Sequence, residues 1–263
     1  MQFLQNKYKI NTPIGKGGFG TLFAGENIKT KEKIAIKKET SDIATLKHEV
    51  KMINFLYLKG VRNITEIYWY GNINDTLYMV MPLYERSLED CIHRIIIKNW
   101  EDKVRTITSI MVQVLDILKH IHDLYIIHRD IKPANFMLKG NDIYLIDFGL
   151  ATFYLNAHGE HYRPMHNIGE NSVIVGSPKY ASIHLHNGYV SSRRDDIISL
   201  CYMAIQLESG VWNIDIENLN NNFYMINMKS RACEYTENKV LRDFLLKAMK
   251  YGFYERPLYD FSG

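Results

Sequence analysis

One short segment of the chain, residues 128–135 (HRDIKPAN), holds a carboxylate, a cation and an amide at close spacing. We interpret Asp130 as the group that accepts or orients the proton of a substrate hydroxyl. Lys132 would neutralise charge on a phosphoryl group in transfer, and Asn135 would hold a magnesium ion. His128 is expected to pack and hydrogen-bond within the loop. This ordered set predicts phosphoryl-transfer chemistry.

A second carboxylate follows an apolar strand. Residues 143–146 (IYLI) run directly into Asp147-Phe148-Gly149. An aspartate at the mouth of an apolar strand is costly unless it is paired or bound to a metal. We therefore predict Asp147 as a second magnesium ligand, with the ion bridging the β and γ phosphates of a nucleotide.

A glycine-rich stretch, residues 14–22 (IGKGGFGTL), lies near the amino terminus. Glycine lets the backbone approach phosphate oxygens closely, so Gly15, Gly17, Gly18 and Gly20 are candidate phosphate contacts. Taken alone, the stretch is better explained as an ordinary glycine turn than as a phosphate site. Strands rather than a helix are expected after it, which favours a β-hairpin flap over ATP rather than a dinucleotide site.

Lys37 lies at the end of a short strand beyond this stretch. Next to a glycine flap, its ammonium group could reach the α and β phosphates. Such a lysine needs a carboxylate to hold it, and we expect Glu49, on the next helix, to do so. Glu32 and Glu39 are poorer candidates because they flank Lys37 on its own strand. The alternative for Glu49 is an ordinary glutamate on the surface of a helix.

The candidate site residues must be positioned by strands in the first part of the chain and by helices after it. The hydrophobic pattern predicts strands at 8–14, 21–26, 33–38, 64–70 and 76–81, with one helix at 42–58. After residues 81–84 the pattern changes to helices, which we expect at 87–97, across 107–121, at 196–207 and at 238–250. The Ser87-Leu88-Glu89-Asp90 segment reads as a capping box. An α+β protein is expected, with a small β-rich lobe and a larger, mainly helical lobe.

The composition excludes several classes of protein. A net charge of +3 over 263 residues is too mild to predict a nucleic-acid-binding surface. The three cysteines form no paired motif, so neither a zinc site nor a disulfide framework is expected. No signal peptide or membrane span is apparent. We expect a cytoplasmic protein, with access to the nucleus left open, that functions as a monomer.

Taken together, the chain resembles the eukaryotic protein kinases over essentially its whole length, and most closely the casein kinase 1 group with its vaccinia-related branch. The segments that carry this resemblance are Ser87–Asp90, Gly176–Ile183 and Ser192–Asp196. In particular, Ala181-Ser182-Ile183 stands where most kinases have Ala-Pro-Glu. The resemblance implies a bilobal kinase fold, ATP and Mg²⁺ as cofactors, and proteins phosphorylated on Ser or Thr as substrates. It also implies that Asp196 braces the catalytic loop.

The resemblance further implies an adenine site. Met81 would close the back of the pocket, and the hinge at 82–84 would offer the Pro82 carbonyl and the Tyr84 N–H to the base. Apolar side chains would sandwich it, namely those of Ile14, Leu22, Ala35, Met137 and Ile146. Ordinary core packing is an equally good explanation for each of these apolar residues.

Kinases of this group often prefer acidic or already phosphorylated substrates. Lys179 matches the basic residue that binds the substrate anion, with Lys229 or Arg231 as a possible partner; a solvated lysine is the alternative. Arg129 could bind an activating phosphate, although the group usually works without one. Candidate phosphorylation sites in the activation segment are Ser172, Ser177 and Tyr180.

The expected organisation is an N-lobe at 1–81, a hinge at 82–84 and a C-lobe at 85–263, in which we expect the final helix of the family to be absent. A pseudokinase scaffold that binds nucleotide or partner proteins is the main alternative. It predicts the loss of Lys37, Asp130, Asn135 or Asp147, and all four are present. A small-molecule phosphotransferase is a further alternative.

Overall fold

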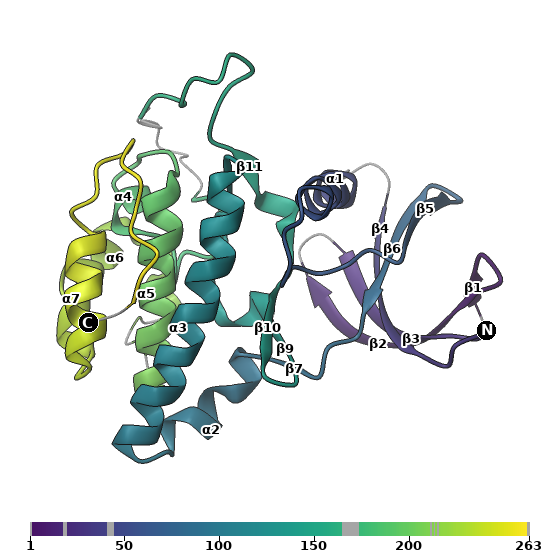
Figure 1. The fold of residues 1–263 in the computed structure, drawn as a ribbon, viewed down its shortest axis with the longest axis horizontal. Coiled ribbons are helices and arrows are strands. Elements are labelled where there is room, and N and C mark those ends of the chain that lie inside the picture. The colour runs from purple at the N-terminus through teal and green to yellow at the C-terminus, as the bar shows by residue number, and fades with distance from the viewer. Residues whose placement is uncertain are drawn as a thin grey trace. The chain divides into compact units, whose positions relative to one another are not determined.

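The computed structural model describes residues 2–17, 20–40, 45–164, 174–210, 212, 214 and 216–261. The chain divides into two compact units, drawn in Figure 1. Unit 1 comprises Met1–Glu85 and Tyr144–Gly149, and unit 2 comprises Arg86–Ile143 and Leu150–Gly263. The first boundary falls just after the predicted hinge.

Unit 1 is built on an antiparallel sheet. Within the described residues this sheet has six strands in the order β1-β2-β3-β4-β6-β5. They are β1 (Gln2–Leu4), β2 (Tyr8–Gly17), β3 (Gly20–Asn27), β4 (Lys33–Thr40), β5 (Trp69–Ile73) and β6 (Thr76–Pro82). One face carries a cluster of buried residues formed by Leu4, Tyr8, Ile34, Ile36, Tyr78 and Val80. Burial of these apolar side chains on one face stabilises the sheet.

The first turn of α1 (Thr45–Leu58), the helix of unit 1, is capped by the side chain of a residue on strand β4. Glu39 on β4 is buried, and its carboxylate accepts hydrogen bonds from the Leu46 N–H at 3.1 Å and from the Thr45 hydroxyl. A carboxylate at this position satisfies helix N–H groups and complements the helix dipole. The predicted apolar face of the helix is confirmed from Leu46 onward. The predicted start at residues 42–44 lies outside the described residues.

The strand predicted at 64–70 is displaced in the structure, where β5 begins at Trp69. Thr65 N–H instead donates to the Leu145 carbonyl at 3.0 Å, which ties Tyr144–Gly149 to unit 1. Asn74 and Asp75 both adopt positive φ, as a tight two-residue hairpin turn requires. This turn extends β5 through residues 71–73, which lie outside the predicted strands.

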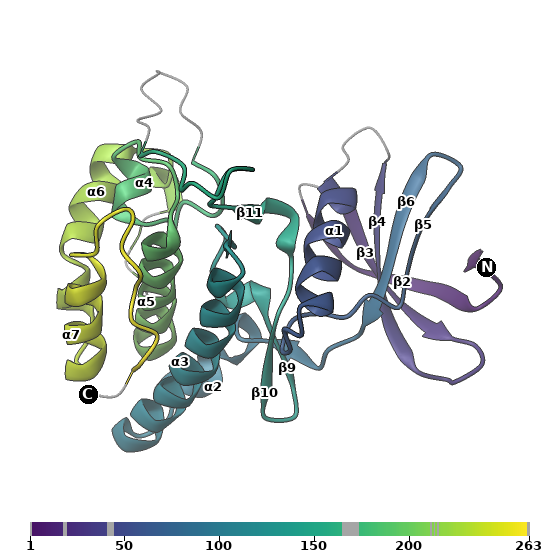
Figure 2. The ribbon, with the colours of Figure 1, turned by 45° about the horizontal axis from the view of Figure 1, so that its top comes forward.

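Unit 2 is mainly helical. Its helices are α2 (Ile92–Ile96), α3 (Trp100–Asp123), α4 (Ile183–His186), α5 (Arg193–Ser209), α6 (Asn222–Ser230) and α7 (Lys239–Ala248). Figures 1 and 2 show α3 and α7 on opposite sides of α5. As a result, α5 is buried from Arg194 to Glu208. The α+β class predicted from the sequence is confirmed.

Short strands connect these helices. They are β7 (Arg86–Ser87), β8 (Ile126–Ile127), β9 (Phe136–Lys139), β10 (Asp142–Leu145) and β11 (Thr152–Phe153). Strands β7 and β9 pair in one small antiparallel sheet, and β8 and β11 pair in another. The segment between β8 and β9 is the predicted catalytic loop, 128–135, so both of its ends are anchored in paired strands.

Helix starts in unit 2 follow local capping signals. The predicted capping box is confirmed, because Ser87 N–H donates to Asp90 at 2.8 Å and Asp90 N–H donates to the Ser87 hydroxyl at 3.2 Å. It opens a 3₁₀ turn at Glu89–Cys91 before α2, rather than one continuous helix. Helices α4 and α6 were not predicted, since α4 is very short and α6 buries only Met225 and Lys229.

Two further expectations concern the whole chain. Cys91, Cys201 and Cys233 are free thiols. Among the described residues, no helix is both long enough and apolar enough to span a bilayer.

Candidate active site

Strand β4 separates core residues from site residues. Its two isoleucines belong to the core cluster, so Ala35 and Lys37 lie on the opposite face of the sheet. Cross-strand partners share a face, and Leu22 on β3 is paired with Lys37 while Met81 on β6 is paired with Ala35. The register therefore brings three of the predicted adenine-contacting residues to the face that carries Lys37.

Lys37 is held between two carboxylates. Its Nζ lies 2.7 Å from Glu49 Oε2 on α1 and 3.2 Å from Asp147 Oδ1. Glu49 is only 2 % exposed, which excludes the alternative of a surface glutamate. The ion pair predicted between Lys37 and Glu49 is therefore present, and Glu39 is occupied elsewhere as the cap of α1.

The electrostatics of this trio favour a charged lysine. Burial acts to lower the pKa of Lys37, but Glu49 and Asp147 outweigh it and raise the pKa above its usual value. Burial raises the pKa of Glu49, and the Lys37 ammonium opposes that shift. Lys37 is therefore a fixed positive charge whose position is set by α1 and by the segment after β10.

Asp147 adopts an uncommon backbone conformation, with φ +62°. A left-handed residue other than glycine costs on the order of 1–2 kcal/mol and persists where surrounding contacts impose it. Its carboxylate is 38 % exposed, so the side chain remains accessible although it pairs with Lys37.

The glycine-rich stretch forms the predicted hairpin. Gly15 pairs with Leu22 and Gly17 pairs with Gly20 across the turn from β2 to β3. A Cβ on Gly20 would overlap the Lys38 carbonyl oxygen on β4, so glycine is required where the flap packs on the sheet. Gly18 lies outside the described residues.

The predicted hinge begins at the last residue of β6. Pro82 is the last residue of the strand and pairs with Ile34, while Met81 is nearly buried with its sulfur 3.9 Å from the Thr65 hydroxyl. The Tyr84 ring lies 5.2 Å from the Tyr144 ring, and burial raises the pKa of Tyr84 to about 12.

The other predicted adenine contacts differ in exposure. Ile14 is 48 % exposed and Ile146 is half-buried in unit 1. Met137 belongs to β9 in unit 2.

Unit 2 gathers the polar groups of the catalytic loop around Asp130. Asp130 Oδ2 lies 2.7 Å from Lys132 Nζ and accepts from Asn135 Nδ2 at 3.1 Å. Its Oδ1 accepts the Ser177 N–H at 2.9 Å, and Lys132 Nζ also donates to the Ser177 hydroxyl at 3.0 Å. The predicted base and cation are thus in contact, and Ser177 joins them from a distant part of the chain.

Asp196 supports the catalytic loop from inside α5. Its carboxylate accepts the backbone N–H groups of His128 at 2.8 Å and Arg129 at 2.9 Å, and it contacts His122 Nε2 at 2.9 Å. Burial would raise the pKa of Asp196, but His122 and these N–H groups lower it, so the carboxylate stays charged. The bracing role implied for Asp196 is confirmed geometrically, and His128 is buried within the loop as predicted.

Gly176 allows the activation segment to approach the catalytic loop. Its φ is +92°, and a Cβ there would overlap the Arg129 carbonyl oxygen and lie 3.4 Å from Asp130 Oδ1. Only glycine combines this backbone conformation with such a close approach. Neither Gly176 nor Ser177 was predicted as part of the site. The only feature of the sequence that could have indicated their role is the glycine directly before the serine.

The two predicted metal ligands have suitable donor atoms. Asn135 Nδ2 faces Asp130, which leaves its Oδ1 as a ligand atom, and Asp147 contributes a carboxylate. Magnesium prefers oxygen ligands of these kinds. No cluster of three or more His, Cys, Asp or Glu side chains suited to a metal occurs in the part of the chain that the structure describes.

A family model described as the protein kinase domain matches residues 8–257. The chain belongs to the protein kinase family. Protein kinase domains generally bind ATP with Mg²⁺. The observed α+β fold, with a β-sheet lobe and a helical lobe, is consistent with this family.

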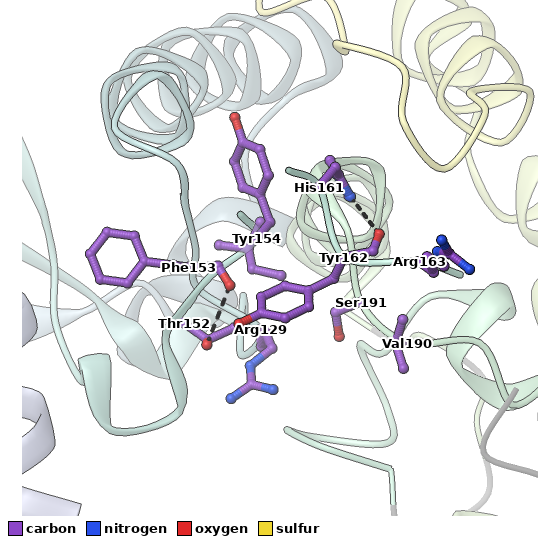
Figure 3. A pocket seen from close by; sticks show the side chains of 10 residues that line it. Arg129, Thr152, Phe153, Tyr154, His161, Tyr162, Arg163, Val190 and Ser191 are labelled. Carbon is purple, nitrogen blue, oxygen red and sulfur yellow. Dashed lines mark hydrogen bonds between the residues drawn. The ribbon is translucent and has the colours of Figure 1, made fainter. Parts of the chain in front are cut away.

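The kinase has a pocket beside Arg129 in unit 2. The pocket has a volume of about 260 Å³, and Figure 3 shows that Tyr154, His161, Tyr162 and Ser191 also line it. Arg129 Nε donates to the Leu150 carbonyl at 2.6 Å. Binding of an activating phosphate by Arg129 stays a prediction.

The candidate phosphorylation sites are not equivalent in the kinase. Ser172 lies outside the described residues. The Ser177 hydroxyl is engaged by Lys132, and Tyr180 is only 7 % exposed. In this conformation, neither Ser177 nor Tyr180 presents a free hydroxyl at the surface.

Lys229 is not a substrate-facing residue. It is fully buried, and its Nζ donates to the Pro178 carbonyl at 2.7 Å and to the Ala181 carbonyl, with His186 Nε2 at 2.9 Å. The suggestion that it partners Lys179 in binding a substrate anion is therefore wrong. Its ammonium group bridges two backbone carbonyls of the Pro178–Ala181 segment.

Arg231, the other suggested partner, pairs with Glu234 at 2.7 Å on the surface of unit 2. Lys179 itself is half-buried with its Nζ 5.6 Å from the centre of the Tyr180 ring. Burial lowers the pKa of Lys179, and Glu89 opposes that shift.

Proposed function

We propose that this protein kinase transfers the γ-phosphoryl group of ATP to Ser or Thr hydroxyls of protein substrates. The observation that carries the proposal is the position of Lys132, whose Nζ lies 2.7 Å from Asp130 and 3.0 Å from the Ser177 hydroxyl. A substrate hydroxyl beside Asp130 would meet a base and a cation at once. Such an arrangement suits proton removal coupled to neutralisation of phosphoryl charge.

Each residue has a distinct part in this proposal. Asp130 accepts or orients the hydroxyl proton, and Lys132 neutralises developing charge. Lys37, held by Glu49, positions the nucleotide phosphates, while Asn135 and Asp147 would hold magnesium, which neutralises phosphate charge when bound. Asp196 keeps the backbone of the loop in place and touches no reacting atom.

We also propose that the kinase is of the casein kinase 1 type. The Ala181-Ser182-Ile183 segment supports this assignment, because Ser182 caps α4 and its hydroxyl donates to the buried Asp195 at 2.5 Å. This bond fixes the segment without the glutamate of the Ala-Pro-Glu triplet.

We also propose a preference for acidic or already phosphorylated substrates, with Lys179 as the residue that binds the substrate anion. Because Lys229 is buried and Arg231 is paired, Lys179 would bind the substrate anion without help from either. Lys179→Glu is expected to slow phosphorylation of primed peptides more than that of unprimed ones. An equal loss on both would refute this role.

The deciding experiment is a phosphotransfer assay with magnesium ATP on peptides that differ only in carrying Ser, Thr or Tyr at the acceptor position. Wild-type protein is expected to modify the Ser and Thr peptides, whereas Asp130→Asn should bind nucleotide in a thermal-shift assay but transfer no phosphate. Nucleotide binding without transfer by the wild type would favour the pseudokinase alternative. Transfer mainly to Tyr would refute the assigned specificity.

A further inference from the structure

An open groove lies in unit 2 between α2, α3 and the turn from β9 to β10. Its volume is about 630 Å³, within the range of about 300–1,000 Å³ typical of ligand-binding sites. In Figures 1 and 2, α2 and the β9–β10 hairpin lie beside α3. None of the residues that line the groove belongs to the active site described above.

The floor of the groove is apolar and its rim is basic. Among the lining residues, the buried Leu88 and Ile95 and the half-buried Leu138 form the floor, and the exposed Arg94 and Lys98 form part of the rim. Among the described residues that line it, none is a carboxylate. A surface with apolar contacts flanked by cations complements a ligand that carries apolar and acidic groups together.

The cations of the rim differ in how far they are neutralised. Arg105 pairs with Asp102 at 3.2 Å, and Lys98 Nζ donates to the neutral Thr106 hydroxyl at 2.7 Å. No ion pair joins Arg94 to a carboxylate of the described residues. Arg94 and Lys98 are therefore the two charges available to an acidic partner.

Exposed apolar side chains lie next to the rim residue Lys98 in the chain. Ile97 and Trp100, which flank Lys98 in the turn from α2 to α3, are 80 % and 43 % exposed. Aromatic residues and arginine, here Trp100 and Arg94, are enriched where proteins bind partners. Exposed apolar surface outside the cavity favours an extended peptide over a compact small molecule.

The groove does not offer a sheet edge for strand addition at Ile143. The N–H of Ile143 on β10 donates to Gln113 Oε1 on α3 at 3.1 Å. A bound peptide would therefore be recognised by its side chains, through apolar contacts on the floor and ion pairs at the rim.

We propose that this groove is a docking site for an extended acidic-apolar segment of a partner protein, with carboxylates paired to Arg94 and Lys98. The proposal goes beyond phosphoryl transfer and does not depend on it. Docking of this kind would select partners by a segment other than the phosphorylated residue.

The test is a fluorescence-anisotropy titration of the whole protein with a short labelled peptide of alternating Leu and Glu residues that lacks Ser, Thr and Tyr. Saturable binding in the micromolar range is expected, and it should persist in Asp130→Asn. Because the peptide has no acceptor hydroxyl, a failure of docking and a failure of kinase activity are distinguishable. Absence of saturable binding would overturn the proposal.

Peptide variants separate the two kinds of contact. Replacing each Leu by Gln, or each Glu by Lys, is expected to abolish saturation. Equal binding of the all-polar acidic peptide, or of single-stranded RNA, would show a non-specific polyanion surface and would also overturn the proposal.

Protein variants locate the site. Arg94→Glu combined with Lys98→Glu should weaken binding by roughly tenfold or more, because like charges would then face each other. The matched control combines Lys247→Glu and Lys250→Glu, at two exposed positions in α7 and just after it. It makes the same charge change away from the groove and should bind the peptide with wild-type affinity.

A bulk substitution checks the floor without changing charge. Ser109→Trp fills the groove from an exposed position on α3 and should block binding, whereas Val112→Trp, on the same helix outside the groove, should not. Equal affinity of the groove variants and their controls would refute the location.

Discussion

Gly176 provides a sharp test of how the activation segment and the catalytic loop are held together. In Gly176→Ala, the new methyl group would overlap the Arg129 carbonyl oxygen. The overlap is with backbone, so it can be relieved only by moving the loop or the segment. Either movement would stretch the bonds from Ser177 to Asp130 and Lys132, now 2.9 and 3.0 Å.

The magnitude has two parts. An alanine at φ +92° is strained by about 1–2 kcal/mol, partly offset by about 0.4–1 kcal/mol from the less flexible unfolded chain. Overpacking against backbone adds about 1–3 kcal/mol. Gly60 separates these terms, because its φ is +86° but a Cβ there would meet nothing within 4 Å. Gly60→Ala should therefore show the strain alone.

The assay is urea unfolding combined with steady-state phosphotransfer on a Ser peptide. Gly176→Ala should be less stable than Gly60→Ala by about 1–3 kcal/mol. Its kcat should fall by on the order of 100-fold, since a displacement of about 1 Å at a catalytic group has effects of this size. Gly60→Ala should retain the wild-type kcat.

Two results would refute this reasoning. Equal stability of the two variants would mean that the contact with Arg129 is absent in solution. A wild-type kcat in Gly176→Ala, despite lowered stability, would mean that the bonds from Ser177 do not organise Asp130.

Three further predictions follow from buried polar groups. Glu49→Gln should lower phosphotransfer by on the order of tenfold or more, because one charged hydrogen bond to Lys37 is worth about 1.5–3 kcal/mol; an unchanged rate would refute the role of the pair. Lys229→Met removes the ammonium donor from the Pro178 and Ala181 carbonyls, so stability should fall by about 1–3 kcal/mol and the KM for peptide should rise with that for ATP unchanged; Lys229→Arg should recover part of both, and an unaltered peptide KM would contradict the positioning role. Burial, and then the Lys229 charge, lower the pKa of His186 to about 4. The contribution of His186 to stability is therefore complete above its unfolded pKa near 6.5, and up to about 3 kcal/mol of it is lost as the pH falls toward 4. In urea unfolding, the free energy of unfolding of His186→Gln should decline less steeply than that of the wild type between about pH 6.5 and 4, and an unchanged slope would contradict this prediction.

Features that depend on near neighbours in the chain could be predicted from the sequence. The catalytic loop, the glycine hairpin and the Ser87–Asp90 capping box are set by residues a few positions apart, and each is found in the structure. The pairing of Lys37 with Glu49 was also predictable, because a strand and the helix that follows it must pack together to bury their apolar faces.

Contacts that join distant segments could not be predicted and became visible only in the folded chain. Ser177 reaches Asp130 because Gly176 permits a close approach to the backbone of the catalytic loop. The partner of Thr65 is Leu145, which displaced the predicted strand at 64–70 to β5. No local pattern encodes either contact.

Lys229 shows the physical reason most clearly. A lysine is normally solvated, so sequence reasoning placed it at the surface as a ligand for an anion. Packing of α6 against the Pro178–Ala181 segment buries it, and backbone carbonyls satisfy its ammonium group. Its role follows from which carbonyl groups the fold leaves in need of a donor, and that is a property of the packed molecule rather than of the residues next to Lys229 in the chain.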